Sequence, residues 1–269
     1  MTSHPFDEAT ALEACGPDTW KGHTSPAYGN MVGPFGGMTA AQALSAVLQH
    51  PQRLGDPVAL TVNFAAALEE GPFEVIARPV RTNRSTQHWT LEIRQNGQAA
   101  LTGTAFTALR RDTWDGAEHT MPQVPNPPDV PLPRHGKRVE WVNRYEMRFI
   151  EGGFPEQWDG HESPASRTRL WLREVPPRPL DFASLTALAD VFFPRIWLRR
   201  ATFVPIGTVS MTVYFHADAA RLQQVGSGYL LGQAQAQAFH AGYFDQSAQL
   251  WTEDGTLLVT THQVVYYKE

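Results

Sequence analysis

The chain has 269 residues, of which 42% are hydrophobic and 18% charged, and this composition excludes a disordered or low-complexity protein. Its 22 Lys and Arg against 27 Asp and Glu give a formal net charge of -5, so no overall basic field attracts nucleic acid or an anionic membrane. Cys15 is the single cysteine, which excludes a disulfide framework and fits a reducing compartment. The N-terminus does not resemble a signal peptide, and no apolar run approaches the ~20 residues of a membrane-spanning helix. We therefore expect a cytoplasmic protein with neither a nucleic-acid nor a membrane partner.

One helix and four strands are predicted in the first half of the chain. Apolar residues recur at helical spacing over residues 38–48, directly after Gly36-Gly37, and Pro51 ends the segment. Residues 59–67, 73–81, 86–95 and 99–109 alternate apolar with polar side chains and are rich in β-branched and aromatic residues, which is typical of strands. Asn96-Gly97, between the last two, favours a tight hairpin turn.

The composition changes over residues 112–137, where six prolines between Pro122 and Pro133 interrupt any periodicity. This segment is interpreted as a linker at the surface with few core contacts. It divides the chain into a first repeat of residues 1–111 and a second repeat of residues 138–269. Strands are predicted in the second repeat at residues 138–150, 166–174, 206–216, 228–238, 243–252 and 257–267, with a helical stretch from about Asp181.

The two halves resemble each other in sequence. Thr61-Val62-Asn63-Phe64 recurs 151 positions later as Thr212-Val213-Tyr214-Phe215, and Asn96-Gly97 has a counterpart in Asp254-Gly255 after an insertion around residues 219–226. Each half has a helix followed by strands joined by short turns, which predicts an α+β fold with an antiparallel sheet around a helix in each copy. Joining the copies edge to edge would give one continuous sheet and hide two exposed edges.

Comparison of the repeats selects three polar residues that occur only in the second copy. Asp190 aligns with Thr39, Thr208 with Pro57, and Gln263 with Ala105. Taken singly, Asp190 could be a helix cap, Thr208 an ordinary strand residue and Gln263 a solvent-facing side chain. Asp190 interrupts an apolar run, however, and the alignment puts it in the first turn of a helix, where the helix dipole would favour a charged general base.

Other signatures are absent or weak. The sequence contains no phosphate-binding loop, zincin motif or serine-hydrolase elbow, and its histidines lack spaced Cys or His partners, so neither a metal nor a cofactor is expected. Arg78, Arg81 and Arg84 could form a basic rim for phosphate groups, although alternate arginines on a strand more often form a solvated face.

Several segments in one order carry a resemblance to a known family: Tyr28-Gly29-Asn30, Gly33-Pro34-Phe35-Gly36-Gly37, Arg81-Thr82-Asn83-Arg84-Ser85, Leu188-Ala189-Asp190, Thr208 with Tyr214-Phe215-His216, and Asp254-Gly255 with Gln263. This set resembles the TesB-like acyl-CoA thioesterase II family over nearly the whole chain outside the linker. The resemblance implies a double hotdog fold, an acyl-CoA substrate, a homo-oligomer and a catalytic set of Asp190, Thr208 and Gln263. Family members commonly continue this Gln with an acidic residue and Gly, whereas Val264-Val265 follows here, which bears on substrate preference.

The leading hypothesis is hydrolysis of an acyl-CoA thioester, with Asp190 as the base that activates water and Thr208 and Gln263 orienting that water. The amide of Gly37, with Gly36 beside it, is the expected donor to the thioester oxygen, and Arg84 is the best candidate for the CoA phosphates. An acyl or acyl-CoA binding module without turnover is the alternative. A hydratase or dehydratase on the same scaffold is a third possibility, which would need a His close to Asp190.

Overall fold

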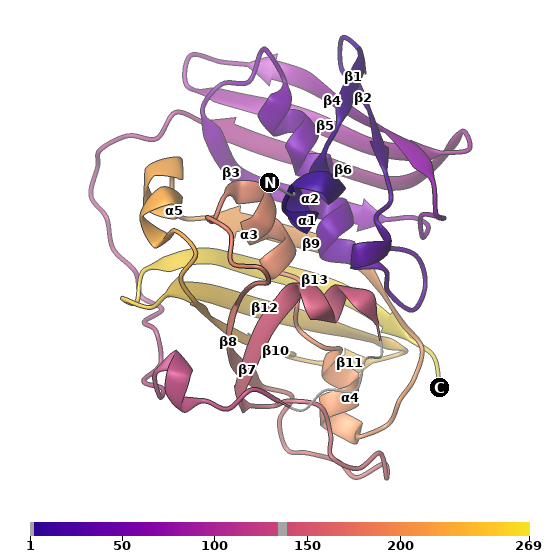
Figure 1. Cartoon of the computed structure of the whole chain (residues 1–269), viewed down its shortest axis with the longest axis vertical. Helices are drawn as coiled ribbons and strands as arrows, with labels where there is room; N and C mark the ends of the chain where they lie inside the picture. Colours follow the sequence, from indigo (N-terminus) through magenta and orange to yellow (C-terminus); the bar gives the residue numbers. More distant parts are fainter. Residues whose placement is uncertain (1–2, 134–138) are drawn as a thin grey trace.

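The computed structural model of the chain describes residues 3–133 and 139–269 (Figure 1). Its strands are β1 (Glu13–Gly16), β2 (Thr19–His23), β3 (Asp56–Phe64), β4 (Pro72–Thr82), β5 (Thr86–Gln95), β6 (Gln98–Ala108), β7 (Tyr145–Glu151), β8 (Thr168–Glu174), β9 (Ile206–Phe215), β10 (Leu230–Gln235), β11 (Phe239–His240), β12 (Tyr243–Thr252) and β13 (Leu257–Tyr267). Its helices are α1 (Pro5–Thr10), α2 (Gly36–Gln49), α3 (Phe182–Leu188), α4 (Arg195–Arg200) and α5 (Ala219–Val225), with 3-10 helices η1 (Pro26–Tyr28), η2 (Pro127–Asp129) and η3 (Glu140–Arg144). No helix within these ranges is both long and apolar enough to cross a membrane.

A single 13-stranded sheet runs through both halves, in the order β1-β2-β4-β5-β6-β3-β9-β13-β12-β10-β8-β7, with β11 paired to β12. The halves join where β3 pairs antiparallel with β9, so the expected edge-to-edge connection is confirmed. Thr61 lies opposite Thr212 in this pairing, and their Oγ1 atoms are 3.1 Å apart. These residues are the equivalent positions of the sequence repeat, so the pairing is symmetric about them.

Helices α2 and α3 lie side by side on the sheet (Figure 1). Every residue from Gly37 to Val47 of α2 is buried, because the helix is covered by the sheet on one side and by α1 and α3 on others. Helix α3 begins with a capping box in which Asp181 accepts a hydrogen bond from the Ser184 N–H and the Ser184 hydroxyl accepts one from the Asp181 N–H. The two helices therefore form a shared core element between the halves.

Arg178 ties the N-terminal helix of the first half to the second half. Its guanidinium lies 2.7 Å from the Asp7 carboxylate of α1 and 2.6 Å from the Asp181 carboxylate at the start of α3. The same group covers the ring of Phe6, 5.0 Å from its centroid. These contacts hold α1 against the α2 and α3 pair.

The predicted elements of the first half are observed with small shifts of their ends. Asn96 and Gly97 form the turn between β5 and β6 with φ values of 53° and 76°, as a tight hairpin requires. Helix α1 and the short strands β1 and β2 were not predicted, because each is too short to show a periodic pattern.

Three predictions for the second half are wrong in detail. The strand expected at residues 138–150 is η3 followed by β7, and residue 138 lies outside the described part of the chain. The insertion expected as a loop contains α5, which begins at an Asp218 cap whose side chain accepts from the Arg221 N–H. The strand expected at residues 228–238 is the shorter β10, and β11 follows beyond that range.

The proline-rich segment has little regular structure, but the expectation of few core contacts is wrong for residues 121–130. Val130 is buried with Trp171, Leu231 and Trp251, and the carbonyl of Pro125 accepts a 2.8 Å hydrogen bond from the Trp171 indole. Two aromatic side chains on the strands thus bind the segment to the sheet. Residues 134–137 of the predicted linker lie outside the described residues.

We predict that Val130→Asp lowers the free energy of unfolding by roughly 2–4 kcal/mol, because it places an unpaired carboxylate in this buried contact. Val80→Asp is the matched control, since the Val80 side chain is 63% exposed. Denaturant unfolding of both variants measures the difference. Equal stability of the two would show that the linker does not pack on the sheet.

Candidate active site

Asp190 lies just after the end of α3, not in the first turn of a helix as the repeat alignment predicted. Helix α3 has only seven residues and ends at Leu188, and the Asp190 N–H bonds to the Ala187 carbonyl, 3.1 Å away. The alignment failed because its constant shift of 151 carries the start of α2 at Gly36 to residue 187, whereas α3 already begins at Phe182. The C-terminal end of α3 does not favour a negative charge, so the support for the ionised carboxylate of Asp190 must come from other groups.

That support comes from the start of α2 in the other half. A Cβ atom on Gly36 would lie 3.0 Å from Asp190 Oδ2, and one on Gly37 would lie 2.8 Å from the Ala187 carbonyl. The backbone N–H of Gly37 is close enough to the Asp190 carboxylate to lower its pKa. The expected proximity of Gly36-Gly37 to Asp190 is therefore confirmed, and two glycines are what allows the backbone to approach so closely.

Gln263 also contacts Asp190 directly. The Gln263 side-chain amide donates a 2.7 Å hydrogen bond to Asp190 Oδ1 and lies 3.4 Å from the sulfur of Met211. Gln263 is 2% exposed and lies opposite Met211 in the pairing of β13 with β9. The hydrogen bond and the burial together hold the carboxamide in one orientation toward the carboxylate.

The electrostatic environment makes Asp190 an unusually weak acid. Asp190 keeps some exposure, but the protein around it desolvates the carboxylate and raises its pKa from 3.8 to about 7. The hydrogen bond from Gln263 and the nearby backbone N–H of Gly37 oppose this shift because they stabilise the charged form. A carboxylate in this state can take up or release a proton near neutral pH.

Thr208 lies on β9, the strand that pairs with the Gln263 strand β13. It is opposite Val265, two residues beyond Gln263, after a register shift between Val264 and Val265. Thr208 is partly buried. Within the described residues no hydrogen bond joins Thr208 to Asp190 or Gln263, so its expected share in the site stays a prediction.

The structure does not bring Arg84 to these residues. Arg84 lies in the turn before β5. The first residue of β5, Thr86, pairs with Ala108 of β6, and Ala108 pairs with Asp56 at the start of β3. Gln263 is aligned, through β9, with Val62 near the end of β3. The rise per residue along the strands and the distance between neighbouring strands then place Arg84 on the order of 25 Å from Gln263.

Aromatic side chains surround the start of α2. The ring of Phe35, the residue before Gly36, stacks on Trp141 with centroids 4.3 Å apart. Tyr145 lies edge-on to both rings, at centroid distances of 6.1 Å from Phe35 and from Trp141. The site is therefore bounded by apolar rings on this side, which explains part of the desolvation of the carboxylate.

Two buried polar residues in this region were not singled out from the sequence. Tyr145 and Glu174 are opposite each other in the β7–β8 pairing, and neither the Tyr145 hydroxyl nor the Glu174 carboxylate has a hydrogen-bond partner among the described residues. Burial raises the pKa of Glu174 to about 8 and the pKa of Tyr145 well above 10.0. Period-two alternation through Leu170 and Leu172 could have placed Glu174 on the buried face.

The described part of the chain contains no cluster of three or more His, Cys, Asp and Glu side chains that could hold a metal ion. No histidine there is hydrogen-bonded to Asp190, so the arrangement is a desolvated carboxylate with amide donors around it. Such a group can activate a water molecule.

Comparisons with known proteins identify the family and the fold of the chain. A family model described as the acyl-CoA thioesterase N-terminal domain matches residues 25–108, and one described as the acyl-CoA thioesterase C-terminal domain matches residues 116–267. A conserved protein of unknown function with a hot dog fold from Alicyclobacillus acidocaldarius is 48% identical, over 100% of this chain and 99% of its own, with a TM-score of 0.94. Comparison with curated proteins gives no significant match.

More distant structures share the fold. The tesB protein of Mycobacterium avium subs paratuberculosis is 18% identical with a TM-score of 0.79, and an acyl-CoA thioesterase II of Mycobacterium marinum is 14% identical with a TM-score of 0.74. Each alignment covers 98% of both chains. The likeness to these structures and to the Alicyclobacillus protein establishes the hot dog fold.

We predict that, as pH rises, the free energy of unfolding falls less in Glu174→Gln than in the wild type. The raised pKa means that folded Glu174 keeps its proton up to about pH 8, whereas the unfolded chain releases it above about pH 4.5. Between these values rising pH favours the unfolded state of the wild type, but glutamine cannot ionise. Denaturant unfolding across this pH window measures the effect, with exposed Glu70→Gln as the control. Parallel curves for wild type and Glu174→Gln would contradict the prediction.

Proposed function

Because the chain belongs to the acyl-CoA thioesterase family, we propose that it hydrolyses an acyl-CoA thioester to the free acid and CoA. The observation that carries this proposal is the contact of Asp190 with both Gln263 and the start of α2 in a desolvated setting. In its active, ionised form Asp190 serves as the general base. Its pKa near 7 is suited to proton transfer at neutral pH.

The proposed reaction needs one water and no covalent intermediate. Asp190 takes a proton from the water as the water oxygen bonds to the thioester carbon, and the carbonyl oxygen becomes negatively charged. The carbon–sulfur bond then breaks, and the thiolate of CoA takes the proton from Asp190. Gln263, fixed by its hydrogen bond to the carboxylate, orients this water, with Thr208 as a further proposed partner.

The amide of Gly37 has two roles in this proposal. Without substrate it stabilises ionised Asp190, and with substrate the thioester oxygen competes for the same donor at the start of α2. Loss of that stabilisation makes Asp190 more basic at the moment when the base is needed. The glycines also leave room for the carbonyl, because a side chain at Gly36 would lie against Asp190.

The remaining expectations are part of the same proposal. The strand order and the pairing of Thr61 with Thr212 support two tandem hotdog repeats of residues 1–111 and 138–269, joined by residues 112–137. One centre then takes its base from the second repeat and its amide donor from the first. Arg84 remains a candidate for binding CoA phosphates, although it lies far from the base.

Release of CoA from a series of acyl-CoA thioesters, followed with a thiol indicator, tests the proposal. Release by the wild type supports hydrolysis. Tight binding of acyl-CoA without release would favour a binding module instead.

We predict that kcat/KM rises about tenfold per pH unit below pH 7 and levels off above it, because only ionised Asp190 can accept the proton of water. Asp190→Asn should lose roughly 100-fold or more in kcat at the plateau while remaining folded. Initial rates from pH 5 to pH 9, at roughly half-unit intervals, measure both effects. Near wild-type turnover by a folded Asp190→Asn protein would falsify the mechanism.

We also predict that Gln263→Ala moves the midpoint of this pH profile upward, because it removes a hydrogen bond that stabilises ionised Asp190. His262→Ala is the matched control on the same strand, since His262 is exposed and lies beside Ser247 on the opposite face. A midpoint that stays in place for Gln263→Ala would show that the amide does not stabilise the base.

A further inference from the structure

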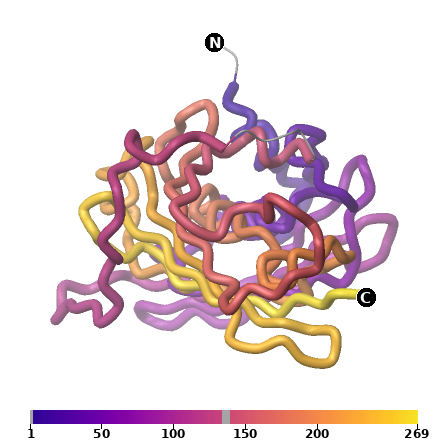
Figure 2. The backbone as a smooth tube through the Cα atoms, turned by 90° about the horizontal axis from the view of Figure 1, so that it is seen from below, coloured from indigo at the N-terminus to yellow at the C-terminus, as the bar shows by residue number. Residues whose placement is uncertain are grey.

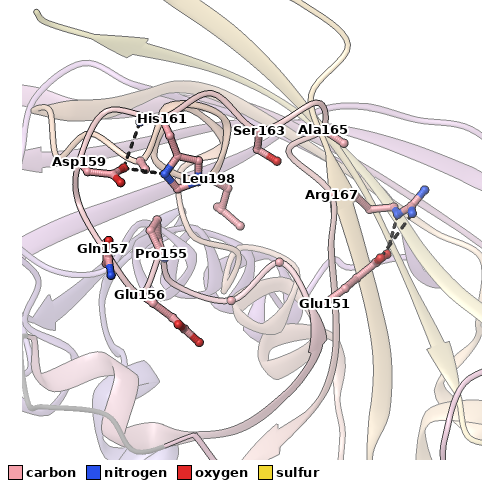
Figure 3. Close-up of a pocket in the computed structure, with 13 residues that line it drawn as sticks. Glu151, Pro155, Glu156, Gln157, Asp159, His161, Ser163, Ala165, Arg167 and Leu198 are labelled. Carbon is pink, nitrogen blue, oxygen red and sulfur yellow. Dashed lines mark hydrogen bonds and ion pairs between the residues drawn. The ribbon is translucent and has the colours of Figure 1, made fainter.

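One buried arginine has no part in the proposed reaction. Arg195, the first residue of α4, is fully buried, and no carboxylate among the described residues lies within ion-pair distance of it. The carboxylate of Glu151, at the end of β7, pairs instead with Arg167 (Figure 3). Burial lowers the pKa of Arg195 to about 9, so the guanidinium is still charged at neutral pH. A charge buried without a counter-ion destabilises a fold unless hydrogen bonds compensate for the lost water.

The Arg195 guanidinium donates to four oxygens, and these belong to three separate segments. One Nη atom lies 2.9 Å from the Ser166 carbonyl, 2.7 Å from the Thr168 hydroxyl and 3.4 Å from the Ala234 carbonyl. The other Nη atom donates to the carbonyl of Phe193. Thr168 begins β8, directly after the loop that crosses the end of the molecule nearest the viewer in Figure 2, and Ala234 lies on β10. One side chain therefore joins β8 and β10 to the chain before α4.

The chain before α4 carries Asp190. Residues 189–194, here the Asp190 segment, connect the end of α3 to the start of α4, and the three residues after Asp190 are buried apolar side chains. Phe192 of this segment also packs on β10, since a Cβ atom on Gly232 would lie 2.9 Å from its ring. The Asp190 segment is thus fixed to β10 at two points, by this ring and by Arg195.

The groups that face Asp190 leave burial as the main cause of its raised pKa. Gln263 of β13 and the Gly37 N–H of α2 lower this pKa, and Tyr145 of β7 stays neutral because its own pKa lies well above 10.0. Among the described residues no charged side chain, Arg195 included, contributes to the pKa of Asp190 directly. Any effect of Arg195 on the base must therefore act through the position of the Asp190 segment.

We propose that Arg195 is a positioning residue for the general base, whose guanidinium holds the Asp190 segment against β8 and β10 and so keeps water away from the carboxylate. The consequence for turnover rests on the proposed thioesterase function. An anchor and a nearby charge give effects of opposite sign. Loss of a nearby positive charge would raise the pKa of Asp190, whereas loss of the anchor admits water to the carboxylate and lowers it.

The test is the midpoint of the Asp190 carboxyl titration, measured by isotope-edited NMR in the wild type and in Arg195→Met. Methionine keeps an unbranched side chain for the buried site but donates no hydrogen bond. The midpoint should fall by about one pH unit or more in Arg195→Met, toward the value of a solvated aspartate.

Arg148→Met is the matched control. Arg148 is 17% exposed, and like Arg195 it donates to the carbonyl of a separate segment, that of Val130, 2.8 Å away. It lies opposite Trp171, on the face of the sheet that residues 121–130 cover. The Asp190 midpoint should therefore be the same in Arg148→Met as in the wild type.

Turnover gives a second measurement. If the chain hydrolyses an acyl-CoA, Arg195→Met should lower kcat roughly tenfold or more at the plateau of the pH profile, with a smaller change in KM, because the base is displaced from the water it activates. If no acyl-CoA is hydrolysed, the proposed function fails, whereas the NMR midpoint still decides the role of Arg195.

An unchanged or raised midpoint in folded Arg195→Met, or an equal fall in Arg148→Met, would overturn the proposal. If Arg195→Met does not fold, Thr168→Val replaces it, because this change removes one acceptor of the guanidinium and leaves the others. Thr168→Val must then give a smaller fall of the midpoint, and a midpoint equal to that of the wild type would contradict the anchoring role.

Discussion

The antiparallel pairing of β3 with β9 joins the two halves of the sheet and fixes how their helices meet. Because the pairing is symmetric about Thr61 and Thr212, α2 and α3 come to lie against each other, with the start of α2 at the end of α3. Asp190 gains its amide donor from the first half only through this arrangement. A one-residue slip of the register would turn every side chain of one half to the other face of the sheet and separate the two helices.

The chemistry proposed for the site depends on a balance between burial and hydrogen bonding. Burial alone would leave Asp190 protonated and unable to act as a base, whereas strong hydrogen bonding alone would hold its pKa low and make it a weak base. Gln263 and Gly37 offset part of the desolvation and leave the pKa near 7.

Much of the fold could be predicted from local patterns, since alternation and helical spacing identify α2 and the longer strands, and Asn96-Gly97 identifies a hairpin. The repeat also selected Asp190 and Gln263, which the structure brings into contact. A constant shift between repeats could not reveal that α3 begins early and is short, so Asp190 was placed in the first turn of a helix when it lies just after α3 ends. The packing of residues 121–130 on Trp171 and Trp251 depends on contacts between distant parts of the chain, which composition does not encode.

The central claim is that Asp190 is a desolvated base whose ionisation is set by groups from both halves. The most direct measurement is an isotope-edited NMR titration of the Asp190 carboxyl group in the intact protein, assigned by the signal that disappears in Asp190→Asn. The account predicts a midpoint near pH 7. A midpoint close to the ordinary aspartate value of 3.8 would mean that the carboxylate is solvated, and would contradict it.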